Sequence, residues 1–341
     1  MKRLFPFASH VPREKRMNIV LCYPAEDSHL RQIQQVAPQA HLINAGQEGV
    51  NDALPDADIF CGHAKVPVDW DRVVQQGRLR WIQSSAAGMD HCLVPSVIAS
   101  DIPVTSSSGL FAPQVAEQTM AMLLGYLRSL PVFFRAQQQR EFIRRPTRDL
   151  RGKTVGIVGL GGNGRWIAKV LAPFEVRILA TDLFPHDPPT CVESLWTADR
   201  LDDLLNASDV VILCVPLNAD TQGLFDAQRL AQMKRGAILV NVARGAVVVE
   251  ADLVKHLESG HISAALLDVT EVEPLAETSP LWDMPNVIIT PHVGAQSDSR
   301  IDDTTNLFCQ NLQRFLNGEP LLNLVDKRLG FPVPRSPSSA G

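Results

Sequence analysis

Short apolar segments rich in β-branched residues alternate with polar segments of helical character along most of this chain. In the first part, strands are predicted at 17–23, 40–44, 57–62, 80–85 and 102–107, with a helix at 27–36. In the second part, strands are predicted at 153–159, 175–182, 209–216, 237–243, 262–269 and 286–290, with helices at 199–206, 250–259 and 297–317. Because strands that alternate with helices form parallel sheets covered on both faces, we expect an α/β fold.

One long segment between these two parts has a different pattern. Residues 112–131 carry apolar side chains on most sides and end at a proline, which predicts a single long helix. A helix of this kind must be buried, either between domains or between subunits. The polar segment 137–152 shows no clear period, so we predict a surface connection there.

Composition narrows the class of protein. With 341 residues the chain is long enough for two domains, and its hydrophobic and charged fractions, 45% and 20%, are ordinary for globular proteins. The net charge of −5 comes without a dense basic stripe, which argues against a nucleic-acid-binding protein. The six cysteines are scattered and form no CxxC pair, so we expect reduced thiols and no metal site.

The two ends of the chain are predicted to lie outside the folded domains. Residues 1–16 are basic with only a short, proline-interrupted apolar patch, so we expect a flexible extension and not a signal peptide, and Met17 is a candidate for the true start. The Pro/Ser-rich residues 331–341 are predicted to be disordered. No run approaches the ~18 apolar residues of a membrane span, so we expect a cytoplasmic protein without a membrane partner.

A glycine-rich loop points to a dinucleotide. In VGIVGLGGNG, Gly159, Gly161 and Gly164 follow a predicted strand and precede an amphipathic helical segment. In that setting the first glycine allows a tight turn, the second lets the backbone approach a pyrophosphate, and the third lets the helix pack on the strand. The helix N-terminus then offers N–H groups to the phosphates.

The end of the next predicted strand indicates which dinucleotide. Asp182 lies 18 residues after Gly164, where a carboxylate accepts hydrogen bonds from the ribose hydroxyls of NAD. A protein that binds NADP usually has a cation there, and Leu183, Phe184 and Pro185 supply none. We therefore expect NAD as the cofactor. The alternative is that Asp182 is only a turn residue before Pro185.

Three further residues suit the chemistry of a keto-acid reduction. Arg244, Glu273 and His292 each follow a predicted strand, and the carboxyl ends of strands line the ligand crevice of a doubly wound sheet. A guanidinium matches a carboxylate with two hydrogen bonds, a histidine titrates near neutral pH, and a nearby carboxylate favours its protonated form. Taken singly, each residue could equally be a surface or turn residue.

Four ordered segments supply a family resemblance. LRGKTVGIVGLGGNG, VNVARGAVVVE, LLDVTEVEPL and ITPHVGA resemble the D-isomer-specific 2-hydroxyacid dehydrogenases, over residues 17 to 330. The resemblance implies that Arg244 binds and polarises the substrate, that His292 is the acid/base and that Glu273 pairs with it. The implied cofactor-binding set is Gly159, Gly161, Gly162, Asn163, Gly164, Asp182, Pro216, Thr221, Val242, Ala243 and Asp268, with Asp268 at the nicotinamide carboxamide.

A segment in the first part resembles the family's substrate loop. In SSAAGMDH the backbone N–H groups of Ala86, Ala87 and Gly88 would hold the substrate carboxylate. The alternative is an ordinary turn with Asp90 near a helix start. Many phosphoglycerate dehydrogenases carry an arginine where this chain has Ser84 and Ser85, so glyoxylate or hydroxypyruvate is preferred over a 3-phosphoglycerate-like substrate.

The resemblance also implies an architecture of two doubly wound parallel-sheet domains. The flavodoxin-like substrate domain would comprise residues 17–112 plus 297–330, and the Rossmann-type NAD-binding domain residues 113–296. By the same analogy the helix at 112–131 would form a homodimer interface; the alternative is burial within one chain. Two other functions stay open. One is an NAD(H)-sensing scaffold or corepressor, and the other is a formate or phosphonate dehydrogenase, although formate dehydrogenases typically have Gln in place of Glu273.

Overall fold

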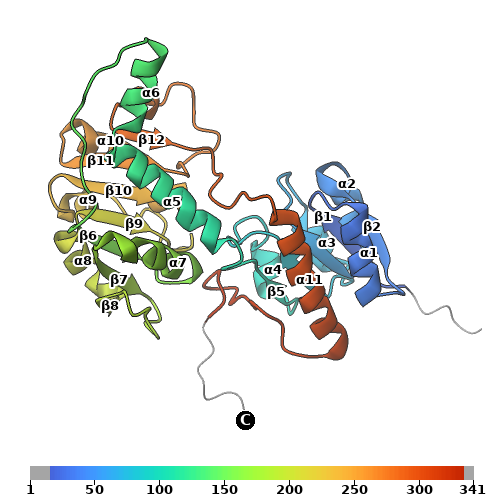
Figure 1. Cartoon of the computed structure of the whole chain (residues 1–341). Helices are drawn as coiled ribbons and strands as arrows, with labels where there is room; N and C mark the ends of the chain where they lie inside the picture. Colours follow the sequence, from blue (N-terminus) through green and yellow to red (C-terminus); the bar gives the residue numbers. More distant parts are fainter. Residues whose placement is uncertain (1–15, 334–341) are drawn as a thin grey trace, which may run out of the picture.

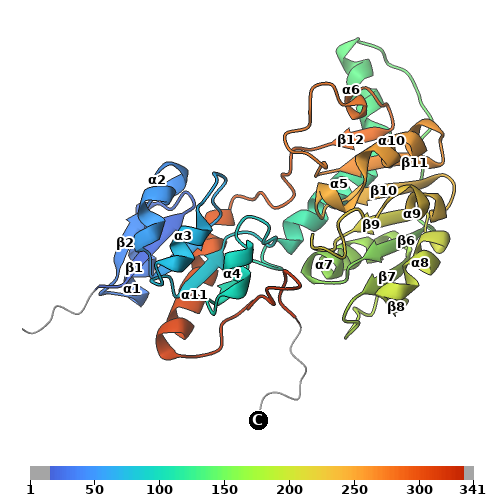
Figure 2. The same cartoon turned by 180° about the vertical axis from the view of Figure 1, so that it is seen from behind.

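The computed structural model describes residues 16–333, which form two α/β lobes (Figures 1 and 2). The first lobe contains a five-stranded sheet in the order β2-β1-β3-β4-β5, and the second a seven-stranded sheet in the order β12-β11-β10-β9-β6-β7-β8. Neighbouring strands pair in parallel in both sheets. The predicted fold class, two doubly wound parallel sheets, is confirmed.

The first lobe follows the predicted strands closely and adds short helices that the pattern did not reveal. Its elements are β1 (Asn18–Cys22), α1 (Asp27–Val36), β2 (His41–Asn44), α2 (Gly46–Ala53), β3 (Ile59–Gly62), α3 (Trp70–Gln75), β4 (Trp81–Ser84), α4 (Pro95–Ala99), β5 (Val104–Thr105) and the returning helix α11 (Arg300–Asn317). Helix α11 is held by stacking of Phe308 on Trp81, with ring centroids 5.4 Å apart. Gly318 ends it in a left-handed conformation, as expected of a glycine C-cap.

The second lobe contains the longer sheet and begins with the helix pair α5 and α6. Its elements are α5 (Ala112–Leu127), α6 (Leu130–Gln138), β6 (Thr154–Val158), α7 (Gly162–Leu171), β7 (Arg177–Asp182), β8 (Ser194–Thr197), α8 (Leu201–Ala207), β9 (Val210–Leu213), α9 (Ala227–Gln232), β10 (Ala237–Asn241), α10 (Glu250–Glu258), β11 (Ile262–Leu267) and β12 (Val287–Ile289). Strand β8 was not predicted. It is a partly exposed edge strand and lacks the continuous apolar run of the buried strands.

The prediction of one helix over 112–131 is wrong. Helix α5 ends at Leu127, Ser129 adopts a left-handed conformation with φ 56°, and α6 begins at Leu130 with Pro131 in its first turn. A proline is tolerated in the first turn because the N–H groups there have no intrahelical partner, so Pro131 starts a helix and does not stop one. Helix α6 also takes the first residues of the predicted connection 137–152.

Burial of α5 is confirmed, and the cause is packing within the second lobe. Val115, Ala116, Leu123 and Leu127 belong to the same apolar core as residues of α7 and the central strands. The apolar surface that this region exposes lies beyond α5, at Leu130 and Phe134 of α6 and at Phe142 of the following segment. Figure 1 shows α6 projecting from the lobe.

The chain crosses between the lobes after β5 and again before α11. After α11, Val325 returns to the first sheet, where its N–H donates to the carbonyl of Val104 at 2.8 Å. The predicted disordered tail begins too early at 331, because the carbonyl of Phe331 accepts a hydrogen bond from the N–H of Asp326 at 3.1 Å. The predicted extension 1–16, apart from Arg16, and residues 334–341 lie outside the described residues. Between residues 16 and 333, no helix is both long and apolar enough to cross a membrane.

Candidate active site

The glycine-rich loop connects β6 to α7 in the manner predicted. Gly159 has a φ of 95°, which makes the tight turn, and a Cβ on Gly164 would lie 2.2 Å from the carbonyl oxygen of Gly159. A Cβ on Gly161 would meet no protein atom within 4 Å, so space is open in front of the loop. Gly162 has a different role, since a Cβ there would lie 2.7 Å from the Cα of Gly109. The loop therefore fits a pyrophosphate and also packs on the segment that joins the lobes.

Asp182 lies at the end of β7, beside this loop. Its Oδ2 accepts a hydrogen bond from the N–H of Leu160 at 2.7 Å, and its Oδ1 accepts from the N–H of Phe184 at 2.8 Å. Each carboxylate oxygen has a further lone pair, so the group remains able to accept from ribose hydroxyls. One cation that the sequence pattern did not reveal lies nearby. The guanidinium of Arg165 donates to the carbonyls of Leu160 and His186 at 3.1 and 2.6 Å.

The loop after β9 carries Pro216 and Thr221. The hydroxyl of Thr221 donates to the carbonyl of Pro216 at 2.6 Å and accepts from the N–H of Asn218 at 2.9 Å. Thr221 thus closes the turn with its own side chain. In the sheet order, β9 and β7 lie on either side of β6, so their loops flank the glycine loop at the carboxyl edge.

Arg244 is presented by a turn that a buried asparagine fixes. Asn241, the last residue of β10, is 1% exposed; its Oδ1 accepts from the N–H of Ala243 and its Nδ2 donates to the carbonyl of Arg244, both at 3.1 Å. Val242 and Ala243 are buried inside the same turn. These two hydrogen bonds fix the turn that places Arg244 at the carboxyl edge of the sheet.

A close backbone contact joins the Arg244 turn to the loop after β11. A Cβ on Gly245 would lie 1.8 Å from the carbonyl oxygen of Thr270, a separation that only glycine permits. The N–H of Thr270 also donates to Oε1 of Glu273 at 3.3 Å. Arg244 and Glu273, 29 positions apart in the chain, are therefore held on neighbouring loops.

Glu273 and His292 form the expected pair. Nδ1 of His292 lies 2.8 Å from Oε2 of Glu273, which leaves Nε2 as the ring nitrogen available to a substrate. Burial raises the pKa of the Glu273 carboxyl, but the hydrogen bond and charge of His292 outweigh this effect and lower the pKa below its usual value. The charge of Arg244 acts in the same direction.

The loop that carries His292 is held by Asp268, which is 4% exposed. Its Oδ1 accepts from the hydroxyl of Thr290 at 2.6 Å and from the N–H of Val293 at 3.0 Å, and its Oδ2 accepts from the N–H of Gly294 at 2.8 Å. The backbone carbonyl of Asp268 accepts from the N–H of His292 at 2.7 Å. The side chain expected at the nicotinamide carboxamide thus also fixes the acid/base loop.

The predicted substrate loop of the first lobe lies against Arg244 of the second. A Cβ on Gly88 would be 1.7 Å from Nη2 of Arg244, and Nε of Arg244 lies 3.2 Å from Oδ1 of Asp90. The Asp90 contact was missed because 154 positions separate the two residues. The N–H of Ala86 already donates to Oγ of Ser84 at 3.0 Å, so only part of the expected N–H cradle is free of internal bonds.

Two histidines that sequence reasoning did not select lie beside Asp90 and Arg244. The rings of His63 and His91 are 4.1 Å apart and tilted by 34°. Burial lowers the pKa of His63, and burial together with the neighbouring His63 ring lowers that of His91 to about 3. Both rings are therefore neutral near pH 7, and the positive charges that act on His63 are those of Arg244, Lys65 and Arg300.

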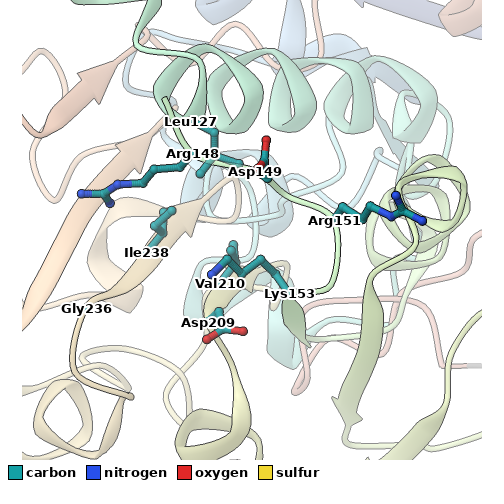
Figure 3. A pocket seen from close by; sticks show the side chains of 9 residues that line it. All are labelled: Leu127, Arg148, Asp149, Arg151, Lys153, Asp209, Val210, Gly236 and Ile238. Carbon is teal, nitrogen blue, oxygen red and sulfur yellow. The ribbon is translucent and has the colours of Figure 1, made fainter. Parts of the chain in front are cut away.

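A separate pocket lies at the opposite edge of the seven-stranded sheet, where the strands begin. It has a volume of about 460 Å³ and is lined by Leu127, Arg148, Asp149, Arg151, Lys153, Asp209, Val210, Gly236 and Ile238 (Figure 3). Ligands of doubly wound sheets bind at the carboxyl ends of strands, and none of the predicted site residues lines this pocket. We therefore do not assign it to the site.

Comparisons with known proteins identify relatives of this chain. The family model for the "D-isomer specific 2-hydroxyacid dehydrogenase, NAD binding domain" matches residues 120–294. A glyoxylate reductase of Thermofilum pendens is 36% identical over 260 residues, covering 74% of this chain and 76% of that protein. A D-3-phosphoglycerate dehydrogenase of Methanocaldococcus jannaschii is 28% identical over 91% of this chain, which spans only 59% of that protein.

A solved structure is similar over nearly the whole chain. The D-isomer specific 2-hydroxyacid dehydrogenase of Xanthobacter autotrophicus, in complex with NADPH and MES, superposes with a TM-score of 0.78 at 30% identity. The superposition covers 93% of this chain and 100% of that one.

Proposed function

Because this chain belongs to the D-isomer-specific 2-hydroxyacid dehydrogenase family, we propose that it reduces a small, unphosphorylated 2-keto acid with NADH. Membership of the family makes the chain an NAD(P)-dependent oxidoreductase. The proposed substrate and the proposed choice of NADH rest on the residues of the candidate site. The observation that carries the proposal is the convergence of four loops, with Nε of Arg244 3.2 Å from Oδ1 of Asp90 and Nδ1 of His292 2.8 Å from Oε2 of Glu273.

Each proposed residue has one task in the reaction. Arg244 holds the substrate carboxylate and polarises the carbonyl at C2, since a guanidinium makes paired hydrogen bonds to such groups. The bound nicotinamide cofactor supplies the hydride that C2 receives. His292 gives the proton from Nε2 to the carbonyl oxygen, and Glu273 holds Nδ1 so that Nε2 faces the substrate. In the oxidation direction neutral His292 takes that proton back.

The cofactor preference rests on Asp182. Its carboxylate lies beside the glycine loop, where it would accept from a ribose 2′-hydroxyl and repel a 2′-phosphate. The similar Xanthobacter protein was solved with NADPH, so the preference is a property to be measured on this chain. Arg165 of α7 donates to the carbonyls of Leu160, His186 and Asp187, so its guanidinium is already bonded between the glycine loop and the loop after β7.

The substrate preference rests on the charge of the first-lobe wall. Ser84 and Ser85 are buried and neutral, and the histidines His63 and His91 are uncharged near pH 7. This wall suits the hydrogen atom of glyoxylate or the hydroxymethyl group of hydroxypyruvate.

A panel of keto acids tests the proposal. Purified protein is assayed at 340 nm with NADH and, in turn, glyoxylate, hydroxypyruvate, 3-phosphohydroxypyruvate and pyruvate, and in the reverse direction with formate and phosphite. We expect the highest kcat/KM with glyoxylate or hydroxypyruvate. Absence of turnover with every keto acid, alongside measurable NADH binding, would instead favour a sensor or scaffold.

We also propose that the chain forms a homodimer, for a reason other than the one expected from the sequence. Helix α5 is buried within its own lobe, whereas Leu130, Phe134 and Phe142 expose apolar surface on and after the projecting helix α6. Leu130 and Phe134 lie one turn apart on α6, and contiguous exposed apolar surface marks protein interfaces. Light scattering on the purified chain and on a Phe134→Asp/Phe142→Asp double variant tests this, with a dimer expected only for the former.

A further inference from the structure

The last described residues form a compact loop that the proposed function does not use. In this C-terminal loop, residues 326–331, Oδ1 of Asp326 accepts from the N–H groups of Arg328 and Leu329 at 2.9 and 3.1 Å. The N–H of Asp326 donates to the carbonyl of Phe331 at 3.1 Å, and that of Gly330 donates to the carbonyl of Asp326 at 2.8 Å. These bonds close the loop on itself and fix the course of its backbone.

The first lobe anchors one side of the C-terminal loop. Val325, directly before the loop, is buried against the end of the first sheet. Nζ of Lys327 donates to the carbonyls of Val97 and Ser100 at 3.0 and 2.6 Å, which ties the loop to α4. The loop therefore belongs to the first lobe by its attachment.

Its other side lies on the second lobe, at two loops of the proposed cofactor site. Nδ2 of Asn218, in the loop after β9, donates to the carbonyl of Leu329 at 2.9 Å. The ring of Phe331 lies 6.3 Å from that of Phe184, in the loop after β7, at an angle of 52°. Phe184 is itself fixed, because its N–H donates to Asp182 at 2.8 Å.

These contacts span the place where an adenine ring would lie. In a doubly wound sheet the dinucleotide crosses the carboxyl ends of the strands, and the loops after β7 and β9 flank the glycine loop on either side. The C-terminal loop joins those two flanking loops, so it closes the adenosine end from outside. Phe184 and Phe331 offer apolar ring surfaces there, and aromatic rings bind the flat faces and edges of bases.

We infer that Phe331, with Phe184, forms the adenine-binding wall of the dinucleotide site. The inference rests on the proposed function only in that a nicotinamide dinucleotide binds along β6. It assigns a cofactor contact to the first lobe's C-terminal loop, outside the second lobe that holds the glycine loop and Asp182. Binding of the adenine ring then also joins the two lobes.

Ligands with and without adenosine separate this role from a merely structural one. Dissociation constants are measured by fluorescence for NADH, for ADP-ribose by competition, and for reduced nicotinamide mononucleotide, which lacks adenosine. The variants are Phe331→Ala, the ring-preserving Phe331→Tyr, Phe184→Ala, and Val333→Ala as a matched control just beyond the loop. Melting temperatures report whether each variant keeps its fold.

We expect Phe331→Ala to weaken NADH and ADP-ribose binding roughly tenfold, the usual worth of one aromatic contact to a base. The mononucleotide should bind as it does to the wild type, Phe331→Tyr should restore dinucleotide binding, and Val333→Ala should change nothing. Phe184→Ala should show the same pattern. A fifth variant, Phe184→Ala combined with Phe331→Ala, should lose less than the sum of the two single losses because the rings act together.

Two results would overturn the inference: unchanged ADP-ribose binding in Phe331→Ala, or an equal loss for the mononucleotide and the dinucleotide. Failure of the proposed function gives a different result. A wild type that binds ADP-ribose but turns over no keto acid would count against the reaction, while the binding ratios would still decide the role of Phe331.

Discussion

Replacing Glu273 by glutamine removes the charge beside the proposed acid/base and keeps the shape of the side chain. Reduction of a keto acid needs a proton on His292, so its rate should fall as the pH rises. A neighbouring carboxylate favours the protonated form, so its removal should move this falling limb to lower pH. Because the pKa of Glu273 is itself lowered, its carboxylate stays charged over the whole limb in the wild type.

The size of the shift follows from the exposure of the pair. Nδ1 of His292 and Oε2 of Glu273 are 2.8 Å apart, and the two side chains are 43% and 39% exposed. At that exposure the pair should exceed the ~0.2–1 kcal/mol of a surface ion pair without reaching the ~1.5–3 kcal/mol of a buried charged hydrogen bond. Loss of an interaction of that size should lower the rate of reduction by the Glu273→Gln variant several-fold at a pH on the falling limb.

The assay is kcat/KM for the best keto acid, with saturating NADH, from about pH 5 to about pH 9.5, a range that brackets the ordinary titration of histidine. Glu271→Gln serves as the matched control, because it removes the same charge two positions away and its carboxylate bonds the N–H of Glu250. His292→Ala should lower kcat on the order of 10²–10⁴-fold at every pH. A Glu273→Gln profile that coincides with that of Glu271→Gln would refute the pairing.

Three further substitutions probe the other parts of the site. Arg244→Lys keeps the positive charge but loses the planar pair of N–H donors of the guanidinium. We therefore expect kcat/KM for the keto acid to fall on the order of 100-fold, with the affinity for NADH unchanged. An unchanged kcat/KM would show that Arg244 is only a surface residue. Asp182→Ala should raise the KM for NADH and narrow the preference over NADPH, and equal use of both cofactors by the wild type would contradict this role. Asp90→Asn should release Nε of Arg244 and raise the KM for the keto acid roughly threefold with NADH binding unchanged, as steady-state kinetics would reveal.

Local sequence patterns predicted most of the helices and strands, and they failed where contacts between distant residues determine the local structure. Strands β6 and β9 are continuous apolar runs, and a run buried on both faces of a sheet has that pattern in any sequence. Strand β8 was not predicted because an edge strand is partly exposed to solvent and so lacks a continuous apolar run. The break between α5 and α6 was not predicted because a proline is compatible with the start of a helix as well as with its end. The left-handed conformation of Ser129 shows that Pro131 lies at a start.

The candidate site likewise has a part that the sequence predicts and a part that only the tertiary structure reveals. The sequence by itself determined the glycine loop, Asp182, and the positions of Arg244, Glu273 and His292 after their strands, because parallel strands bring such loops to one edge. It could not determine that Gly245 packs on Thr270, that Asp90 bonds Arg244, or that Phe331 reaches Phe184. Those contacts join residues of different loops and lobes, and their distances depend on how the two sheets pack, which no periodicity along the chain encodes.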